Sequence, residues 1–233
     1  MKKIAGIVIA RHSLLKGTLR LQLLTQDQGV IVGCVRKEKA ASAFMEGSYV
    51  EGSCVRESSL PYWSLQQIEE PVFLHICDDF ARLLTWKSAL DMCTALSENT
   101  VALATYTALL RLNGSMRQET VQWKKDYIQF ELNFLSNMGY GLSLDRCAVT
   151  GEKESLAYIS PRTGCAVIET VGQPYAEKLL DYSPAFAMLK DKNADLSLEQ
   201  FRQALVVLNY FIQKNVRKKL MRNQLHELLS DGT

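Results

Sequence analysis

Basic side chains in the first 60 residues are the clearest candidates for chemistry, and that chemistry is phosphate binding. Nine Lys and Arg residues oppose five Asp and Glu residues there, an excess of four positive charges. The candidate DNA-binding residues are Arg11, Lys16, Arg20, Arg36, Lys37, Lys39 and Arg56. Such cations follow the phosphates of a single strand, while Tyr49, Tyr62 or Trp63 could stack on a base. The alternative is that these charges merely keep a small domain in solution.

A second basic cluster lies near the end of the chain, in "FIQKNVRKKLMRN". No acidic residue occurs between Glu199 and Glu227, and helical spacing puts some of the cations on one face. The candidate partner-binding residues are Lys214, Arg217, Lys218, Arg222 and Phe211. This stripe could bind phosphate or hold the carboxylates of an acidic peptide beside an apolar pocket. Alternatively, the apolar residues are core and the cations an ordinary solvated helix end.

Catalytic motifs are absent from the sequence. It contains no phosphate-binding GxxxxGK[ST] loop, no GxGxxG, no GxSxG and no HExxH. His12, His75 and His226 are far apart, and Asp78 and Asp79 lie near an expected helix start, where carboxylates favour the macrodipole. We therefore expect a protein that is not an enzyme and uses no metal or cofactor.

The elements that must position these residues change in type along the chain. Residues 4–10, 18–24, 29–35, 48–56 and 62–68 have the pattern of short strands. Residues 72–98, 100–112, 119–138 and 197–229 have helical periodicity. We predict an α+β multidomain protein: a five-stranded OB-type barrel over residues 1–72, then an all-helical domain over 73–233. The seam is expected at Pro71, which resists continuing either element.

Composition indicates the compartment. The chain of 233 residues is 47% apolar and 22% charged, as in ordinary globular proteins. Six cysteines occur without any CxxC pair, which favours free thiols in a reducing compartment. No run approaches the roughly 20 apolar residues of a spanning helix, and Arg11 ends the apolar N-terminal run early. A cytoplasmic protein without a membrane segment is expected.

The middle of the chain carries the most specific pattern. It comprises "FELNFLSNMGYGLSLDRCAVTGE" at residues 130–152, "LAYISPRTGCAV" at 156–167 and "GQPYAEKLL" at 172–180. Together with the order of barrel, helices and basic C-terminal helix, this pattern closely resembles the RecO family of recombination mediators. The resemblance extends over essentially the whole chain, with its specificity concentrated in residues 130–180.

The resemblance implies a function. Members of the family are non-enzymatic proteins that bind single- and double-stranded DNA and anneal complementary strands. They act with RecR and with the acidic tail of the single-stranded DNA-binding protein to load recombinase. A nucleoid-associated protein is therefore expected. A helical adaptor whose barrel and basic helix bind only proteins is the alternative; steep salt dependence of DNA binding would separate the two.

The resemblance also raises a question about zinc. Zinc-binding members carry two cysteine pairs in the hairpin after the glycine-rich turn, and a structural zinc site needs four ligands. Here only Cys147 and Cys165 are present, and Thr150 stands where the first pair would be completed. We therefore expect a degenerate, metal-free knuckle inserted at about residues 143–172, packed under Tyr158 and Ile159. The turn at its tip is expected over 160–164.

Overall fold

The computed structural model describes most of the chain as two compact units. The described residues are 2–14, 17–36, 44–118, 121–191, 194–216, 220–222 and 224–225. One unit comprises Met1–Gln118 with Leu220–Arg222, and the other comprises Glu119–Lys219 with Asn223–Thr233. The first unit therefore holds helices as well as the barrel, and a separate domain over residues 1–72 stays a prediction.

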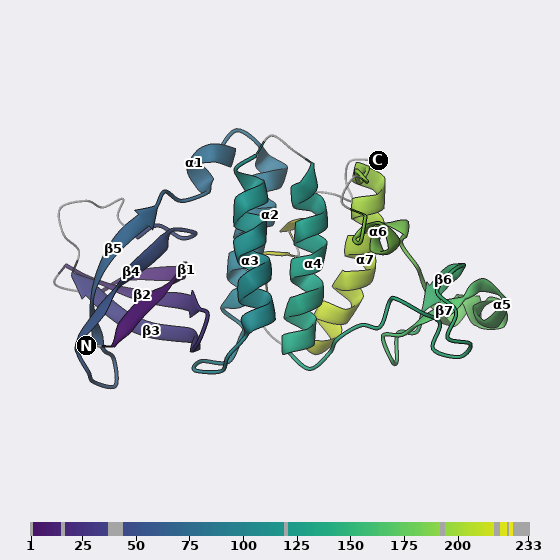
Figure 1. Ribbon diagram of the computed structural model, residues 1–233, viewed down its shortest axis with the longest axis horizontal. Coiled ribbons are helices and arrows are strands. Elements are labelled where there is room, and N and C mark those ends of the chain that lie inside the picture. The colour runs from purple at the N-terminus through teal and green to yellow at the C-terminus, as the bar shows by residue number, and fades with distance from the viewer. Residues whose placement is uncertain are drawn as a thin grey trace. The chain divides into compact units, whose positions relative to one another are not determined.

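Five strands of the first unit form a closed barrel (Figure 1). They are β1 (Lys3–Leu14), β2 (Thr18–Thr25), β3 (Gly29–Arg36), β4 (Tyr49–Arg56) and β5 (Tyr62–Glu69). Their order around the barrel is β1-β2-β3-β5-β4, with antiparallel neighbours except for the parallel β3–β5 pair. The predicted fold class, a five-stranded barrel followed by a helical region, is confirmed.

Alternation of side chains along the strands fills the barrel. Leu19, Leu21 and Leu23 of β2 are all buried and belong to one apolar cluster, because successive side chains of a strand point to opposite faces. Trp63 of β5 joins this cluster at 5% exposure. Its indole lies against Gly33 of β3, where an added Cβ would stand 2.3 Å from the ring. Only glycine allows the indole to lie so close to β3.

The described part of the first unit also contains the helices α1 (Phe73–Ile76), α2 (Phe80–Cys93) and α3 (Leu103–Met116). Residues 72–98 have helical periodicity but form two helices, because Asp79 has extended backbone and its carboxylate accepts a hydrogen bond from the Arg82 N–H. This N-cap starts α2 anew. The helix start expected near Asp78 and Asp79 is therefore confirmed. Arg117, at the end of α3, bonds His75 at 3.1 Å and forms an ion pair with Glu69 at 3.6 Å, which ties α3 to α1 and to the end of β5.

The second unit is mainly helical and carries a small sheet (Figure 1). Its elements are α4 (Gln122–Asn137), β6 (Leu156–Ile159), β7 (Ala166–Ile168), α5 (Glu169–Gly172), the 3-10 helix η1 (Gln173–Lys178), β8 (Leu180–Asp181), α6 (Pro184–Met188) and α7 (Leu198–Asn215). Helices α4 and α7 pack together through aromatic rings. Trp123 meets Phe201 edge-on at 5.4 Å between centroids, and Tyr127 meets it at 6.1 Å.

The start of α7 and the end of α4 both carry capping residues that can be recognised in the sequence. Ser197 and Gln200 form a capping box that starts α7. At the end of α4, the N–H groups of Gly139 and Tyr140 donate to the carbonyls of Ser136 and Leu135. Gly139 has φ +86°, so this is a Schellman cap that favours glycine. The predicted cap at Gly139 is confirmed.

The sheet of the second unit has the order β7-β6-β8. Residues 160–164 form the turn between β6 and β7, as predicted, with Gly164 at φ +70°. Ile159 is fully buried, and the Tyr158 ring lies against Gly172. Within the described ranges, no helix is both long and apolar enough to cross a membrane.

Candidate nucleic-acid interface

Strand register brings basic and aromatic residues into one row across the barrel. Going from β1 to β4, the directly paired residues are His12, Arg20, Cys34, Tyr62 and Arg56. Residues paired in this way share a face of the sheet. Because Leu19 and Leu21 point into the barrel, Arg20 and the rest of this row lie on its outer face. We call this set, with Thr18 and Arg36, the outer row.

Tyr62 is the centre of the outer row. The Arg56 guanidinium lies 5.4 Å from the centroid of its ring, within the range of a cation–π contact. The Tyr62 hydroxyl shares a hydrogen bond of 2.9 Å with the hydroxyl of Thr18, whose register partner is Arg36. Burial raises the pKa of the Cys34 thiol, and the charge of Arg20 opposes this shift. Arg56 therefore contacts the half-buried Tyr62 ring, while Arg20 and Arg36 lie on the same face of the neighbouring strands.

Of the other basic residues predicted in the barrel, Arg11 is the one that the structure describes, and it does not join this row. Arg11 pairs with Leu21, whose side chain is in the core, so the register puts Arg11 on the inner face of the sheet. Lys16, Lys37 and Lys39 lie outside the described residues. Among the described candidates, Arg20, Arg36 and Arg56 are therefore the ones that the fold brings together.

Two of the three aromatic candidates for base stacking are engaged elsewhere. Trp63 lies in the barrel core, so the suggestion that it stacks on a base is wrong: its neighbour Tyr62 points outward, and alternation turns Trp63 inward. Tyr49 is an interaction partner of Tyr106. Burial and this hydrogen-bonded neighbour raise the pKa of Tyr106 to about 12.

The C-terminal basic cluster is only partly at the surface. Phe211 is 4% exposed and Arg222 is 1% exposed, so neither lines an open pocket. The prediction of an accessible apolar pocket on this helix is wrong. Leu208, Phe211 and Ile212 recur at helical spacing, but all three are buried in the core. Lys214 is exposed, but its ammonium donates to the Pro161 carbonyl at 2.9 Å. Arg217 and Lys218 lie outside the described residues.

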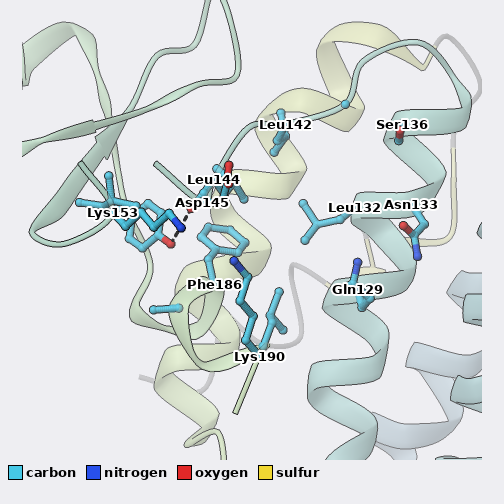
Figure 2. A pocket seen from close by; sticks show the side chains of 15 residues that line it. Gln129, Leu132, Asn133, Ser136, Leu142, Leu144, Asp145, Lys153, Phe186 and Lys190 are labelled. Atoms are coloured by element: carbon cyan, nitrogen blue, oxygen red, sulfur yellow. Dashed lines mark hydrogen bonds between the residues drawn. The ribbon is translucent and has the colours of Figure 1, made fainter. Parts of the chain in front are cut away.

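The second unit contains a cleft that the sequence did not reveal (Figure 2). It has a volume of about 490 Å³ and lies between α4, the segment after Gly139 and α6. Apolar side chains of Leu132, Leu142 and Phe186 line it. The charged lining residues are Asp145, Lys153 and Lys190. This combination of apolar surface and two ammonium groups suits an apolar ligand that carries a carboxylate.

Local hydrogen bonds fix the wall of the cleft that contains Asp145. The Tyr182 hydroxyl donates to the Leu144 carbonyl at 3.1 Å, and its ring packs edge-on against Phe186 at 5.6 Å between centroids. The Arg146 Nε lies 3.4 Å from Asp145 Oδ2. This hydrogen bond holds the pKa of the Asp145 carboxyl below its usual range, and the charge of Lys190 adds to the effect.

In the knuckle segment, hydrogen-bond donors surround the sulfur of Cys147. Burial disfavours the Cys147 thiolate, but hydrogen bonds from the Thr150 hydroxyl and from the backbone N–H groups of Thr150, Ile168 and Val149 lower the pKa of Cys147 to about 7. Thr150 thus supplies a donor at the position where a CxxC pair has its second sulfur. In the part of the chain that the structure describes, no three His, Cys, Asp or Glu residues gather as a metal site. The absence of zinc stays a prediction.

A five-stranded barrel with a basic outer row, followed by helices and a small sheet, defines an OB-barrel protein of the α+β multidomain class. Residues 96–224 match the family model described as "Recombination protein O C terminal". The chain is 30% identical over 214 residues to DNA repair protein RecO of Ehrlichia chaffeensis, covering 90% of this chain and 88% of the relative. It is also 30% identical over 237 residues to DNA repair protein RecO of Wolbachia pipientis wMel, covering 96% and 98%.

The chain therefore belongs to the RecO family, and the resemblance found in residues 130–180 is confirmed. Its role lies in DNA repair and recombination, with DNA and recombination proteins as its general partners.

Proposed function

We propose that this protein is a non-enzymatic recombination mediator that binds single- and double-stranded DNA on the outer row of its barrel. Annealing of complementary strands and loading of recombinase follow from holding DNA there together with partner proteins. The observation that carries the proposal is that Arg20, Arg36 and Arg56 share the outer face of the barrel with Tyr62, whose ring Arg56 contacts. DNA binding would place the protein on the nucleoid in the cytoplasm.

The outer row offers both contacts that a single strand needs. Guanidinium groups bind phosphate oxygens through several donors, which holds the backbone without reading its sequence. A half-exposed ring between them offers a face to an unstacked base, and every base has such a face. A duplex keeps its bases stacked, so it would use the arginines alone. Single strands should therefore bind more tightly than duplexes of equal length.

Substitution of Tyr62 tests this proposal. Tyr62→Ala should weaken binding of a short single-stranded oligonucleotide by about 1–3 kcal/mol, the usual value of one base–aromatic stack. Tyr62→Phe keeps the ring and should bind nearly as wild type, although it loses the hydrogen bond to Thr18. Fluorescence anisotropy at fixed salt measures both variants. Equal binding by Tyr62→Ala and wild type would exclude stacking at this residue.

The cleft of the second unit supports a partner proposal. The acidic tail of a single-stranded DNA-binding protein, expected from the family, ends in an apolar residue with a free carboxylate. Phe186 and Leu142 offer apolar contact to such an end, and Lys190 and Lys153 offer positive charge. We assign the tail to this cleft rather than to the C-terminal helix, because Leu208, Phe211 and Ile212, the apolar residues expected to form the pocket there, are buried. RecR remains a partner by family resemblance alone.

Removal of one ammonium group tests the partner site. Lys190→Gln should weaken binding of an acidic tail peptide about fivefold, the upper range for an exposed charge contact. Lys178→Gln is the matched control, because it removes the same charge from an exposed residue of η1 that does not line the cleft. Peptide titration by calorimetry compares them. Equal losses in both variants would mean that only net charge matters.

An adaptor that binds proteins alone remains the second candidate. Leu198, Val206 and Tyr210 are exposed on α7, and such apolar residues favour protein contacts. This candidate predicts no salt-sensitive binding of DNA.

A further inference from the structure

The cleft that we assign to the acidic tail carries an acidic residue of its own. Among the described residues that line it, Asp145 is the one carboxylate, and Lys153 and Lys190 are the lining cations. Figure 2 shows Asp145 and Lys190 on either side of Phe186, opposite Gln129 and Leu132 of α4. A carboxylate at this place repels the ligand that the rest of the lining attracts.

The position of Asp145 is held by the fold. The Tyr182 hydroxyl donates to the carbonyl of Leu144, the residue before Asp145. This bond ties the segment to Tyr182, which directly follows β8. The Arg146 Nε also lies 3.4 Å from Asp145 Oδ2 and pairs with the carboxylate. The side chain of Asp145 is 44% exposed, so the carboxylate remains hydrated. The Asp145 carboxylate therefore lies in the wall of the cleft and leaves the cleft open to a ligand.

We infer that Asp145 competes with the ligand carboxylate for Lys190 and so limits the affinity of the cleft for acidic peptide ends. In the free protein the Lys190 ammonium and the Asp145 carboxylate attract one another, since the charge of Lys190 helps to lower the pKa of Asp145. A bound peptide must compete with that attraction and also approach a like charge. The peptide therefore binds more weakly than the apolar lining and two ammonium groups alone would allow.

This inference rests on the proposed function of the cleft, and one set of titrations tests both. The probe is an acidic peptide with an apolar last residue and a free carboxylate, titrated at low salt. Asp145→Asn should bind it about two- to fivefold more tightly than wild type, the range for exposed charge pairs. Glu177→Gln is the matched control, since it removes the same charge from an exposed residue of η1 outside the cleft. It should bind as wild type.

A double-mutant cycle identifies the group for which Asp145 competes. When Lys190→Gln is already present, Asp145→Asn should tighten binding by less than half of the factor seen in wild type. An equal gain in both backgrounds, or an equal gain from Glu177→Gln, would overturn the inference. Binding by wild type without any gain in Asp145→Asn would overturn it while leaving the partner site intact. If neither wild type nor Asp145→Asn binds the peptide, the partner site and the inference both fall.

Discussion

Replacement of Arg20, Arg36 and Arg56 together by alanine is expected to weaken binding of single-stranded DNA on the order of 100-fold at 0.1 M salt. Each phosphate contact on a single strand releases about 0.7 of a counterion, worth about fivefold in affinity at that salt. Three contacts multiply to roughly that total. The loss should be the same for oligonucleotides of different sequence, because phosphate contacts carry no sequence information.

The control for this variant must remove equal charge elsewhere. Lys87, Arg146 and Lys178 are exposed and lie outside the outer row, so alanine at all three gives the same net charge. This control protein should retain most of its affinity in the same titration. If it loses as much affinity as the triple arginine variant, binding depends on the overall field of the protein and the outer row has no special part.

Trp63→Ala should produce the largest loss of stability in the barrel. The indole is 5% exposed and packs against Gly33, so truncation leaves a cavity. Large aromatic residues truncated in a core typically cost about 3–5 kcal/mol. Thermal or urea unfolding followed by circular dichroism measures the loss. Tyr62→Ala, at the half-buried neighbouring position, should cost much less.

Trp63 also distinguishes a structural role from a binding role. Trp63→Phe keeps an aromatic ring in the core and should be folded at low temperature. Its affinity for single-stranded DNA should then match that of wild type, because the ring does not reach the outer face. A folded Trp63→Phe protein that fails to bind DNA would show that the core assignment of this side chain is wrong.

The barrel was predictable because strand periodicity is local. Alternation in "TLRLQLL" identifies β2 without knowledge of its neighbours. The same rule could have resolved the aromatic pair in β5, since Ser64 and Gln66 are polar and share a face with Tyr62, while Leu65 shares one with Trp63. That signal was present in the sequence, and the prediction overlooked it.

The sites were less predictable because they depend on register and on distant segments. Tyr62 meets Arg20 only through Cys34, across two strand pairings that periodicity does not determine. The cleft joins residues from α4 to Lys190, and one wall is α6, a helix of 5 residues. A helix of that length shows no clear periodicity. At the C-terminal helix, apolar spacing alone could not distinguish a core face from an open pocket.

The central claim is that DNA binds through its phosphates to the outer row, and the salt dependence of binding tests it most directly. The logarithm of the association constant for a short single strand should be measured against the logarithm of salt concentration, for wild type and for the variant with alanine at Arg20, Arg36 and Arg56. We predict a steep slope for wild type and a slope shallower by about 2 for the variant, from three contacts at about 0.7 each. Equal slopes for the two proteins, or a wild-type slope near zero, would contradict the claim.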